Sequence, residues 1–284
     1  MQVGYLTLLV HRDTIIDMKG ENDMYIPETI RSYIGKDYSL NTIGCSGAQV
    51  LIFHEYVLKI EKDCNMSANE RRMMQWLNGK LPVPNIIAAE HHGDTRYLLM
   101  SKIPGCYLCA ADILDDQLKL ADLVAEGLQR MWRIDVNECP TKRTLDDKFI
   151  EIEAGLRGGW ITMDQASQDS TYGPQGFDSP SALFDWLVKN RPVEELVFSH
   201  GDYCLPNLFT ENGNKISGYI DLGLSGVADK WVDIEKGLWS MWANSTGRFG
   251  GKIRSFDRKS LFDALEIVPD EDKLRYYSLL SELC

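Results

Sequence analysis

The chain has 284 residues, of which 44% are hydrophobic, and a formal net charge of −12 at pH 7. This length and composition suit one two-lobed globular enzyme and exclude a disordered chain. The negative charge argues against nucleic acid or an anionic membrane surface as a partner, because proteins bind phosphate groups through Lys and Arg. A cationic small molecule would be attracted instead.

The cysteine content points to a reducing compartment. Seven cysteines are scattered along the chain, an odd number that does not suggest a disulfide framework. The one close pair, Cys106 and Cys109, has no second pair to complete a zinc site. No stretch approaches the roughly eighteen apolar residues of a membrane span, and the apolar run Tyr5 to Val10 lacks the basic start of a signal peptide. We therefore expect a cytoplasmic protein.

The N-terminal region begins with residues 1–23, an extension of unknown role. Two strands are then predicted, Tyr38 to Thr42 and Gln49 to Phe53, and the loop Ile43 to Ala48 joins them. Backbone N–H groups of this loop and the Ser46 hydroxyl could lie over phosphates. The loop lacks the G-x-G-x-x-G spacing of protein kinases, so a simple hairpin turn is the alternative.

A lysine follows on the next predicted strand. Val57 to Ile60 carries Lys59 among apolar neighbours, and Glu70 opens a helix expected at about Asn69 to Asn78. Lys59 would reach the α- and β-phosphates of a nucleotide while Glu70 fixes its ammonium group. The alternative for Lys59 alone is a solvated side chain on a strand edge.

Beyond Leu98 to Ser101 the chain becomes mainly helical. Pro104-Gly105 marks a junction between the two lobes. The apolar residues of 116–133, from Leu118 to Trp132, follow the spacing of a buried helix face. Further helices are predicted from the cap Ser179-Pro180, at Trp231 to Trp242 and at Phe256 to Leu265.

The most informative residues lie between these helices. His200-Gly201-Asp202 follows the hydrophobic run 195–198, Asn207 comes next, and Asp221-Leu222-Gly223 ends a predicted hairpin whose turn is Asn212-Gly213. Phosphoryl transfer mainly requires an aligned hydroxyl and neutralised phosphate charge. Asp202 would accept the hydroxyl proton, and the oxygens of Asn207 and Asp221 would ligate Mg²⁺.

We therefore predict an α+β, protein-kinase-like, two-lobed fold. Residues 24–101 would form a β-rich N-lobe that binds the nucleotide. Residues 102–284 would form a mainly helical C-lobe with the catalytic loop, the magnesium site and the substrate site. The predicted cofactors are ATP and Mg²⁺, bound in the cleft between the lobes with the acceptor alcohol at its mouth.

Other segments give the chain a more specific resemblance. From about Met24 to its last residue it resembles the aminoglycoside 3′-phosphotransferases, with matching segments in the same order and with similar spacing. The segments that carry the resemblance are Lys80–Pro84, Leu98–Ser101, Glu195–Asp202, Ile220–Gly223, Ala228–Ile234 and Tyr276–Cys284.

This resemblance implies a cationic acceptor, an aminoglycoside phosphorylated at its 3′-hydroxyl, with antibiotic resistance as the consequence. It also implies Asp202 as the catalytic Asp and Asn207 and Asp221 as the magnesium ligands. Whether the enzyme is a monomer or a homodimer stays open. The further roles that it implies are Ser46, Lys59 and Glu70 at the phosphates, Ser101 to Ile103 at adenine, and Asp169 and Glu282 at the acceptor.

The chain also departs from the family pattern. Leu224 stands where an Arg is common, Ser281 where a second acidic residue is expected, Cys284 where the chain ends in an aromatic residue, and Val57 where an aromatic side chain stacks on adenine. The substrate loop has Tyr172 where another carboxylate is expected. These differences bear on the antibiotic spectrum and on the hydroxyl that is modified.

Two alternatives remain at this stage. A kinase of another small alcohol, such as a macrolide or the metabolite choline, would share the same catalytic motifs. A non-catalytic ATP-binding protein should have lost Lys59, Asp202 or Asp221, and the sequence keeps all three. The carboxylates between Asp263 and Glu282 could line an acceptor site or form a solvated helix face.

Overall fold

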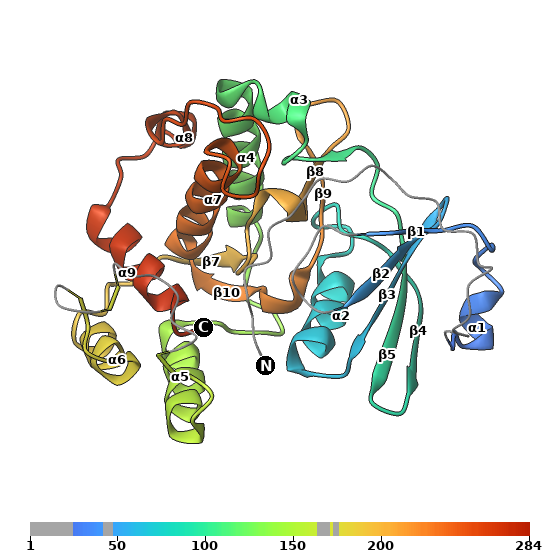
Figure 1. Ribbon diagram of the computed structural model, residues 1–284, viewed down its shortest axis with the longest axis horizontal. Helices are drawn as coiled ribbons and strands as arrows, with labels where there is room; N and C mark the ends of the chain where they lie inside the picture. The colour runs from blue at the N-terminus through green and yellow to red at the C-terminus, as the bar shows by residue number, and fades with distance from the viewer. Residues whose placement is uncertain (1–24, 42–47, 164–170, 173–175) are drawn as a thin grey trace.

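The computed structural model describes residues 25–41, 48–163, 171–172 and 176–284. The fold is α+β, as predicted, with an antiparallel sheet in the N-terminal part and mostly helices beyond it (Figure 1). The sheet has five strands in the order β1-β2-β3-β5-β4. The strands are β1 (Ser39–Leu40), β2 (Gln49–Ile52), β3 (Tyr56–Lys62), β4 (Ile86–His92) and β5 (Thr95–Ser101).

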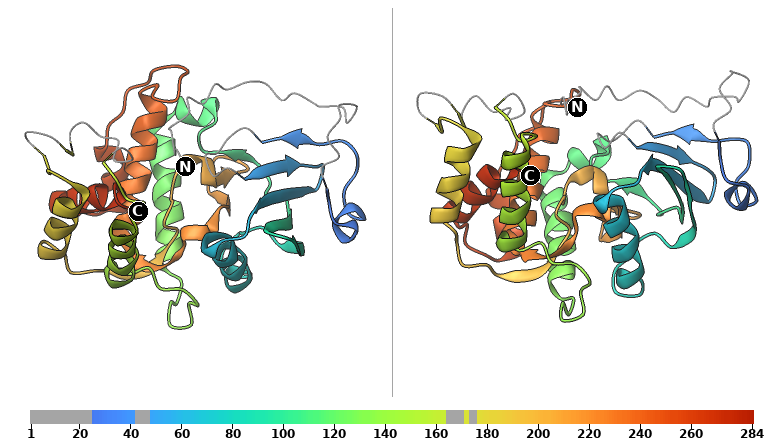
Figure 2. Two further views of the ribbon diagram at one scale, coloured as in Figure 1. Left: turned by 60° about the horizontal axis from the view of Figure 1, so that its bottom comes forward. Right: turned by 90° about the horizontal axis from the view of Figure 1, so that it is seen from below.

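Two helices accompany this sheet, α1 (Glu28–Arg31) and α2 (Asn65–Leu77). Helix α2 starts a turn earlier than the sequence indicated, because Cys64 and Ser67 form a capping box at its N-terminus. Glu70 therefore lies in the second turn of α2 and does not open it. In Figures 1 and 2, α2 lies between the sheet and the helical part of the molecule.

The two faces of the sheet contribute to different apolar cores. Leu58, Tyr97 and Leu99 belong to a small cluster on the side of α1. Leu98 and Met100, which alternate with them along β5, join a larger cluster that also contains Met73 and Leu77 of α2 and most of the helical part. Helix α2 is therefore packed into the core of the C-terminal half, although its sequence follows β3.

A short irregular segment after Ser101 leads into the C-terminal half. The chain then forms β6 (Cys106–Tyr107), which pairs with the hairpin of β8 (Leu208–Thr210) and β9 (Ile216–Tyr219). Gly105 has φ of 100°, and a Cβ there would lie 2.2 Å from the carbonyl oxygen of Thr210. Only glycine suits this crossing, because it tolerates the left-handed backbone and has no Cβ to clash.

Most of the apolar face of helix α4 (Gln117–Trp132) lies in the core of the C-terminal half. Asp116 caps the N-terminus of α4 by accepting a hydrogen bond from the Lys119 amide. Leu118 is 71% exposed, so its predicted place on the buried face is wrong; the apolar stripe begins at Leu120. The other helices are α3 (Ala111–Leu114), α5 (Leu145–Gly158), α6 (Pro180–Lys189), α7 (Lys230–Ser245), α8 (Lys259–Leu265) and α9 (Glu271–Ser281).

A two-stranded ribbon lies beside the predicted catalytic loop. Strand β7 (Leu196–Ser199) pairs antiparallel with β10 (Gly226–Asp229), and two 3₁₀ turns, η1 (Leu205–Asn207) and η2 (Leu222–Leu224), lie between them in sequence. The ribbon brings the residues after β7 next to the residues before β10. The two motifs predicted to be catalytic are therefore neighbours because of strand pairing.

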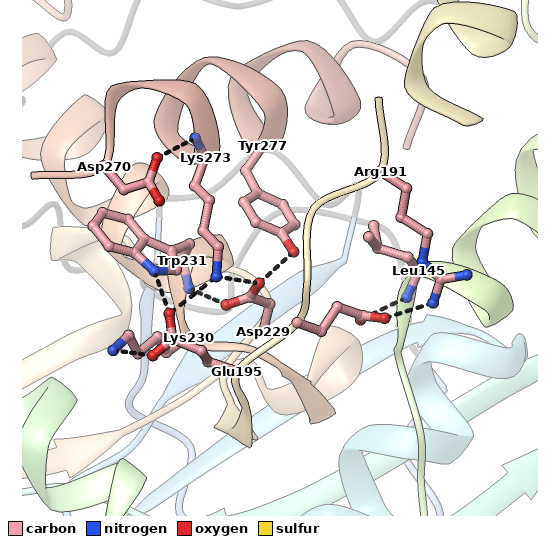
Figure 3. Close-up of polar contacts among 10 residues, drawn as sticks. Leu145, Arg191, Glu195, Asp229, Lys230, Trp231, Asp270, Lys273 and Tyr277 are labelled. Carbon is pink, nitrogen blue, oxygen red and sulfur yellow. Dashed lines mark hydrogen bonds and ion pairs between the residues drawn. The ribbon is translucent and has the colours of Figure 1, made fainter. Parts of the chain in front are cut away.

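Helix α9 is tied to this ribbon by a polar network (Figure 3). Buried Asp229, at the end of β10, accepts from the Tyr277 hydroxyl at 2.7 Å and from the Trp231 amide at 3.1 Å. Glu195 accepts from Lys273 at 2.9 Å and from the Trp231 indole at 3.1 Å. The network fixes the C-terminal helix, which ends just before Glu282. No helix in the described part of the chain has the length and apolar character needed to cross a bilayer.

Candidate active site

Lys59 is surrounded by three carboxylates. Its Nζ lies 2.8 Å from Glu70, 3.1 Å from Asp221 and 3.4 Å from Glu61. Burial alone would lower the pKa of Lys59, but the adjacent carboxylates outweigh burial and raise it above its ordinary value. The lysine is therefore charged, and it joins the N-terminal sheet, α2 and the Asp221 segment through one ammonium group.

Helix α2 is attached to the segment after Asp221 by the residue next to Glu70. Buried Asn69 donates to the carbonyls of Gly223 at 3.0 Å and Ser225 at 2.9 Å, and it accepts from the Thr141 hydroxyl at 2.6 Å. A Cβ on Gly223 would lie 3.2 Å from the Met66 carbonyl oxygen, so the approach of helix and turn is close. Consecutive residues of α2 thus position Lys59 and the Asp221 turn.

The backbone of the catalytic loop is held by helix α7. Asp233, which is fully buried, accepts from the amide of His200 at 2.8 Å and from the amide of Gly201 at 2.9 Å. Burial raises the pKa of Asp233, and His200 and these amides oppose that rise. Gly201 has φ of 78° and packs against the Leu224 carbonyl, where a Cβ would lie 2.3 Å from its oxygen.

The His200 ring connects the two catalytic motifs. Its Nδ1 accepts from the Asp202 amide at 3.3 Å, and its Nε2 lies 2.9 Å from the Ile220 carbonyl oxygen. Because Nδ1 accepts, Nε2 carries the proton and donates to Ile220. The imidazole therefore links the backbone of Asp202 to the residue that precedes Asp221.

The three predicted reaction-centre residues come together. Asn207 Nδ2 donates to the carbonyl oxygen of Asp202 at 3.0 Å and to its carboxylate at 3.1 Å. The Ile220 amide donates to the Asn207 carbonyl at 3.0 Å, which brings Asp221 beside this pair. Asp221 has the left-handed backbone of φ 61° and ψ 54°, rare for a residue with a Cβ. Such a conformation persists where surrounding contacts hold it, and it often marks a functional site.

The donor set fits a magnesium–phosphate complex. The side-chain nitrogen of Asn207 donates to Asp202, so its amide oxygen is available as a metal ligand. The Asp221 carboxylate is 40% exposed and can also reach a metal ion. Over the residues that the structure describes, no three His, Cys, Asp or Glu side chains gather into a metal cluster. Mg²⁺ bound with a nucleotide needs only one or two protein carboxylates, because waters and phosphates complete its coordination.

The predicted adenine segment lies at the junction of the two halves. The Ser101 amide donates to the Asn85 carbonyl at 2.9 Å, so its backbone is bound to the N-terminal part. Ile103 packs against the β8–β9 hairpin, where a Cβ on Gly218 would lie 2.3 Å from its Cγ2. The Ser217 hydroxyl donates to the Pro104 carbonyl at 2.8 Å. The segment is thus held from both sides.

A cavity of about 530 Å³ opens beside the catalytic loop. Its wall combines residues of α2, α5 and α7 with the end of α9, and Gly201, the neighbour of Asp202, belongs to it. Most carboxylates of the C-terminal run lie elsewhere: Asp263 pairs with Lys259, and Asp270 caps α9. Those residues form surface ion pairs and helix caps, as the second of the two alternatives proposed.

Glu282 lies beside this cavity, between the lining residues Ser281 and Cys284. Burial raises its pKa. Burial raises the pKa of Glu235 of α7, which lines the cavity; Lys236 opposes this rise and the negative charge of Glu282 adds to it. The wall also carries the cationic side chains of Arg72, Arg143, Lys148 and Lys236, so it presents charges of both signs. Ser46 and Asp169, the other predicted contacts, lie outside the described residues.

Sequence reasoning assigned no role to three residues of this site, Glu61, Asp233 and Lys236. Glu61 had a signal, because it stands two residues after Lys59 and side chains at that spacing share one face of a strand. Asp233 also had a signal, since it is a carboxylate between the apolar residues Trp231 and Ile234 of the α7 sequence. Lys236 had none, because only tertiary packing brings it to Asp202, 3.6 Å away.

These features define a class of protein. A strand lysine paired with a helix glutamate, opposite an Asp, an Asn and a second Asp on an α+β fold, is the arrangement of kinase-like phosphotransferases. Comparison with known proteins agrees: the profile of the phosphotransferase enzyme family matches residues 43–277. An aminoglycoside 3′-phosphotransferase of Enterococcus faecalis is 38% identical over 216 residues, 75% of this chain and 77% of that one. The chain belongs to this family of phosphotransferase enzymes.

Solved structures show the same fold. A type VIII aminoglycoside-3′-phosphotransferase superposes with a TM-score of 0.71 at 21% identity, over 90% of this chain and 98% of that one. An aminoglycoside phosphotransferase of Streptomyces rimosus, in complex with ADP and streptomycin, superposes with a TM-score of 0.62 at 22% identity, over 85% and 94%. These likenesses confirm the predicted kinase-like architecture.

Proposed function

We propose that this enzyme transfers the γ-phosphoryl group of MgATP to the 3′-hydroxyl of an aminoglycoside, and so confers resistance to it. The observation that carries the proposal is the pairing of Lys59 with Glu70 and Asp221 on one side and of Asp202 with Asn207 on the other. Similarity to aminoglycoside 3′-phosphotransferases supports the choice of acceptor.

The nucleotide would lie between the sheet and the catalytic loop. Lys59 would bind the α- and β-phosphates, held in direction by Glu70 at 2.8 Å. The backbone of Ser101 to Ile103 would bind adenine, because this segment is fixed to both halves of the molecule. Asp221 now contacts Lys59 at 3.1 Å. It would exchange part of that contact for the metal when the nucleotide enters.

Asp202 would hold the acceptor. Its carboxylate accepts from Asn207 and is 31% exposed, so it can also accept a hydrogen bond from an incoming hydroxyl. The acceptor oxygen forms its bond to the γ-phosphorus while the bond from that phosphorus to the β–γ bridging oxygen breaks and ADP leaves. The hydroxyl proton passes toward Asp202. Mg²⁺ held by Asn207 and Asp221 would neutralise charge on the phosphates.

The cavity beside Gly201 would receive the rest of the acceptor. Its volume of about 530 Å³ lies within the range of roughly 300–1,000 Å³ that is usual for small-molecule sites. Glu235 lines it and Glu282 lies beside it, so an aminoglycoside ammonium group would be attracted to this part of a wall that carries charges of both signs.

Mass spectrometry tests the proposal. Kanamycin, neomycin, a 3′-deoxy aminoglycoside, a macrolide and choline are each incubated with enzyme and MgATP. We expect a gain of one phosphate on kanamycin and neomycin and none on the 3′-deoxy compound. Phosphorylation of the macrolide or of choline alone would reassign the acceptor. Phosphorylation of the 3′-deoxy compound to the same extent would reassign the hydroxyl.

A further inference from the structure

A lysine from helix α7 reaches the predicted catalytic carboxylate. Lys236 Nζ lies 3.6 Å from Asp202 Oδ1, and the two side chains are 33% and 31% exposed. Lys236 also lines the cavity of the proposed acceptor site, together with Gly201 and Leu224. Its ammonium group therefore stands at the boundary between the catalytic loop and the acceptor.

The placement of Lys236 follows from the same helix that fixes the loop. Asp233 and Lys236 are three residues apart on α7 and so share one face of it. Asp233 accepts from two loop amides at 2.8 and 2.9 Å, which sets the loop at a fixed distance from the helix. The Lys236 side chain then reaches the loop's carboxylate from the adjacent turn of α7.

The chemistry at this point calls for a cation. Asp202 carries a negative charge beside the position where the anionic γ-phosphoryl group must arrive, and like charges at close range repel. Leu224, whose carbonyl lies against Gly201, is aliphatic and supplies no compensating charge. Lys236 is the cation that lies in ion-pair range of Asp202 among the described residues.

We propose that Lys236 is a further catalytic residue, whose ammonium group contacts an oxygen of the phosphoryl group as it passes to the hydroxyl held by Asp202. This inference rests on the proposed function. The hydroxyl oxygen that receives the phosphoryl group is hydrogen-bonded to the carboxylate that Lys236 contacts, so the phosphoryl oxygens come close to Nζ during the transfer. The benefit is greatest in the transition state, where charge develops on the transferring group.

A purely structural role accounts poorly for this ion pair. Pairs between partly exposed side chains contribute little to folding, roughly 0–1 kcal/mol. Lys236 Nζ also lies 5.8 Å from the centre of the Trp239 ring, a contact that does not involve Asp202. A Lys236→Met variant keeps most of the stem, so its fold should survive while the charge is lost.

Steady-state kinetics on Lys236→Met and Lys236→Arg tests the inference. Lys252→Met is the matched control, because Lys252 pairs with Asp115 at 3.0 Å and lies outside the cavity lining. We expect kcat to fall about 10²-fold in Lys236→Met, with the KM values for ATP and acceptor changed less than about threefold. Lys236→Arg should recover at least about tenfold of that loss. The control should match the unmodified enzyme.

Three results would overturn the inference: kcat within about twofold of the unmodified enzyme, a loss seen only in the acceptor KM, or no recovery in the Arg variant while the Met variant is folded. If the unmodified enzyme phosphorylates no compound in the panel, the proposed acceptor is wrong, but the proposed role of Lys236 is not yet contradicted. ATP hydrolysis without acceptor then decides, because water replaces the hydroxyl at Asp202. We expect Lys236→Met to slow this hydrolysis as well, and an equal rate contradicts the proposed contact.

Discussion

Asp233 accepts a hydrogen bond from the backbone amide of His200 at 2.8 Å. Its second oxygen accepts from the Gly201 amide at 2.9 Å, so one buried carboxylate fixes the loop that carries Asp202. Catalysis of phosphoryl transfer depends mainly on positioning. The position of Asp202 therefore depends on Asp233, a helix residue thirty-one positions further along the chain.

Replacement of Asp233 by Asn should loosen this loop. The amide side chain presents one oxygen and one NH2 group, so one of the two backbone amides loses its acceptor. We expect the free energy of unfolding to fall by about 2 kcal/mol and kcat to fall at least about tenfold. Urea denaturation and steady-state kinetics measure both. Asp263→Asn, on the surface of α8, is the control, and equal effects in both variants would contradict the assigned role.

Metal dependence should report on Asp221. Chelation of divalent cations is expected to abolish transfer by the unmodified enzyme, because Mg²⁺ bridges the phosphates. Asp221→Asn keeps the size of the side chain and removes its charge, so half-maximal activity should require at least about tenfold more Mg²⁺. Titration of activity with Mg²⁺ measures this shift. An unchanged titration curve would remove Asp221 from the metal site.

Asn69→Ala should separate helix α2 from the catalytic half. The variant loses hydrogen bonds to the buried carbonyls of Gly223 and Ser225 and the one accepted from the Thr141 hydroxyl. Each lost bond costs about 1 kcal/mol, so we expect about 3 kcal/mol less stability. The KM for ATP should also rise, since Glu70 directs Lys59 from the same helix. Differential scanning fluorimetry and ATP titration measure these effects; a stability loss with unchanged ATP affinity would show that α2 attachment is only structural.

The stability that Glu195 contributes should depend on pH. Hydrogen bonds from Lys230, Lys273 and Trp231 lower the pKa of Glu195 to about 2 in the folded protein, Lys230 being the largest cause. The unfolded value is about 4.3, so the contribution is complete above about pH 4.5 and declines as pH falls toward 2. Because the Glu195 side chain is 50% exposed, we expect only about 1 kcal/mol.

Comparison of Glu195→Gln with the unmodified protein measures this dependence. Urea unfolding is measured at pH 7, 5, 4 and 3.5. The free energy of unfolding of the two proteins should differ by the same amount at pH 7 and 5 and by a smaller amount at pH 4 and 3.5. A difference in unfolding free energy that grows as pH falls would contradict this prediction. It would mean that Lys230, Lys273 and Trp231 do not stabilise the ionised carboxylate of Glu195 (Figure 3).

The sequence predicted the parts of this molecule that local patterns determine. Hydrophobic periodicity placed β3 and α4, and the Ser179-Pro180 cap placed α6, where the Ser179 hydroxyl accepts from the Ala182 amide at 3.1 Å. Chemical logic selected Lys59, Glu70, Asp202, Asn207 and Asp221. The structure pairs Lys59 with Glu70 and Asp221, and Asp202 with Asn207. The two groups are linked by the Ile220 amide, which donates to the Asn207 carbonyl.

The remaining features depend on contacts between distant segments. Asn69 was expected at the start of a helix, yet it lies inside α2 and is buried because α2 packs on η2. Lys236 is one charged residue among several on a helix, and its spacing gives no sign of Asp202. Leu118 fitted the apolar stripe of α4 but faces solvent, because the helix begins just before it. Such positions are decided by tertiary packing.

The most direct test of the account is the rate of Asp202→Ala with MgATP and kanamycin, with ATP affinity measured separately. Removal of a positioned base should lower kcat by about 10²-fold or more, while ATP binding stays within about threefold because Lys59 and Asp221 remain. A near-normal kcat in a folded variant would contradict the central claim that Asp202 receives the acceptor hydroxyl.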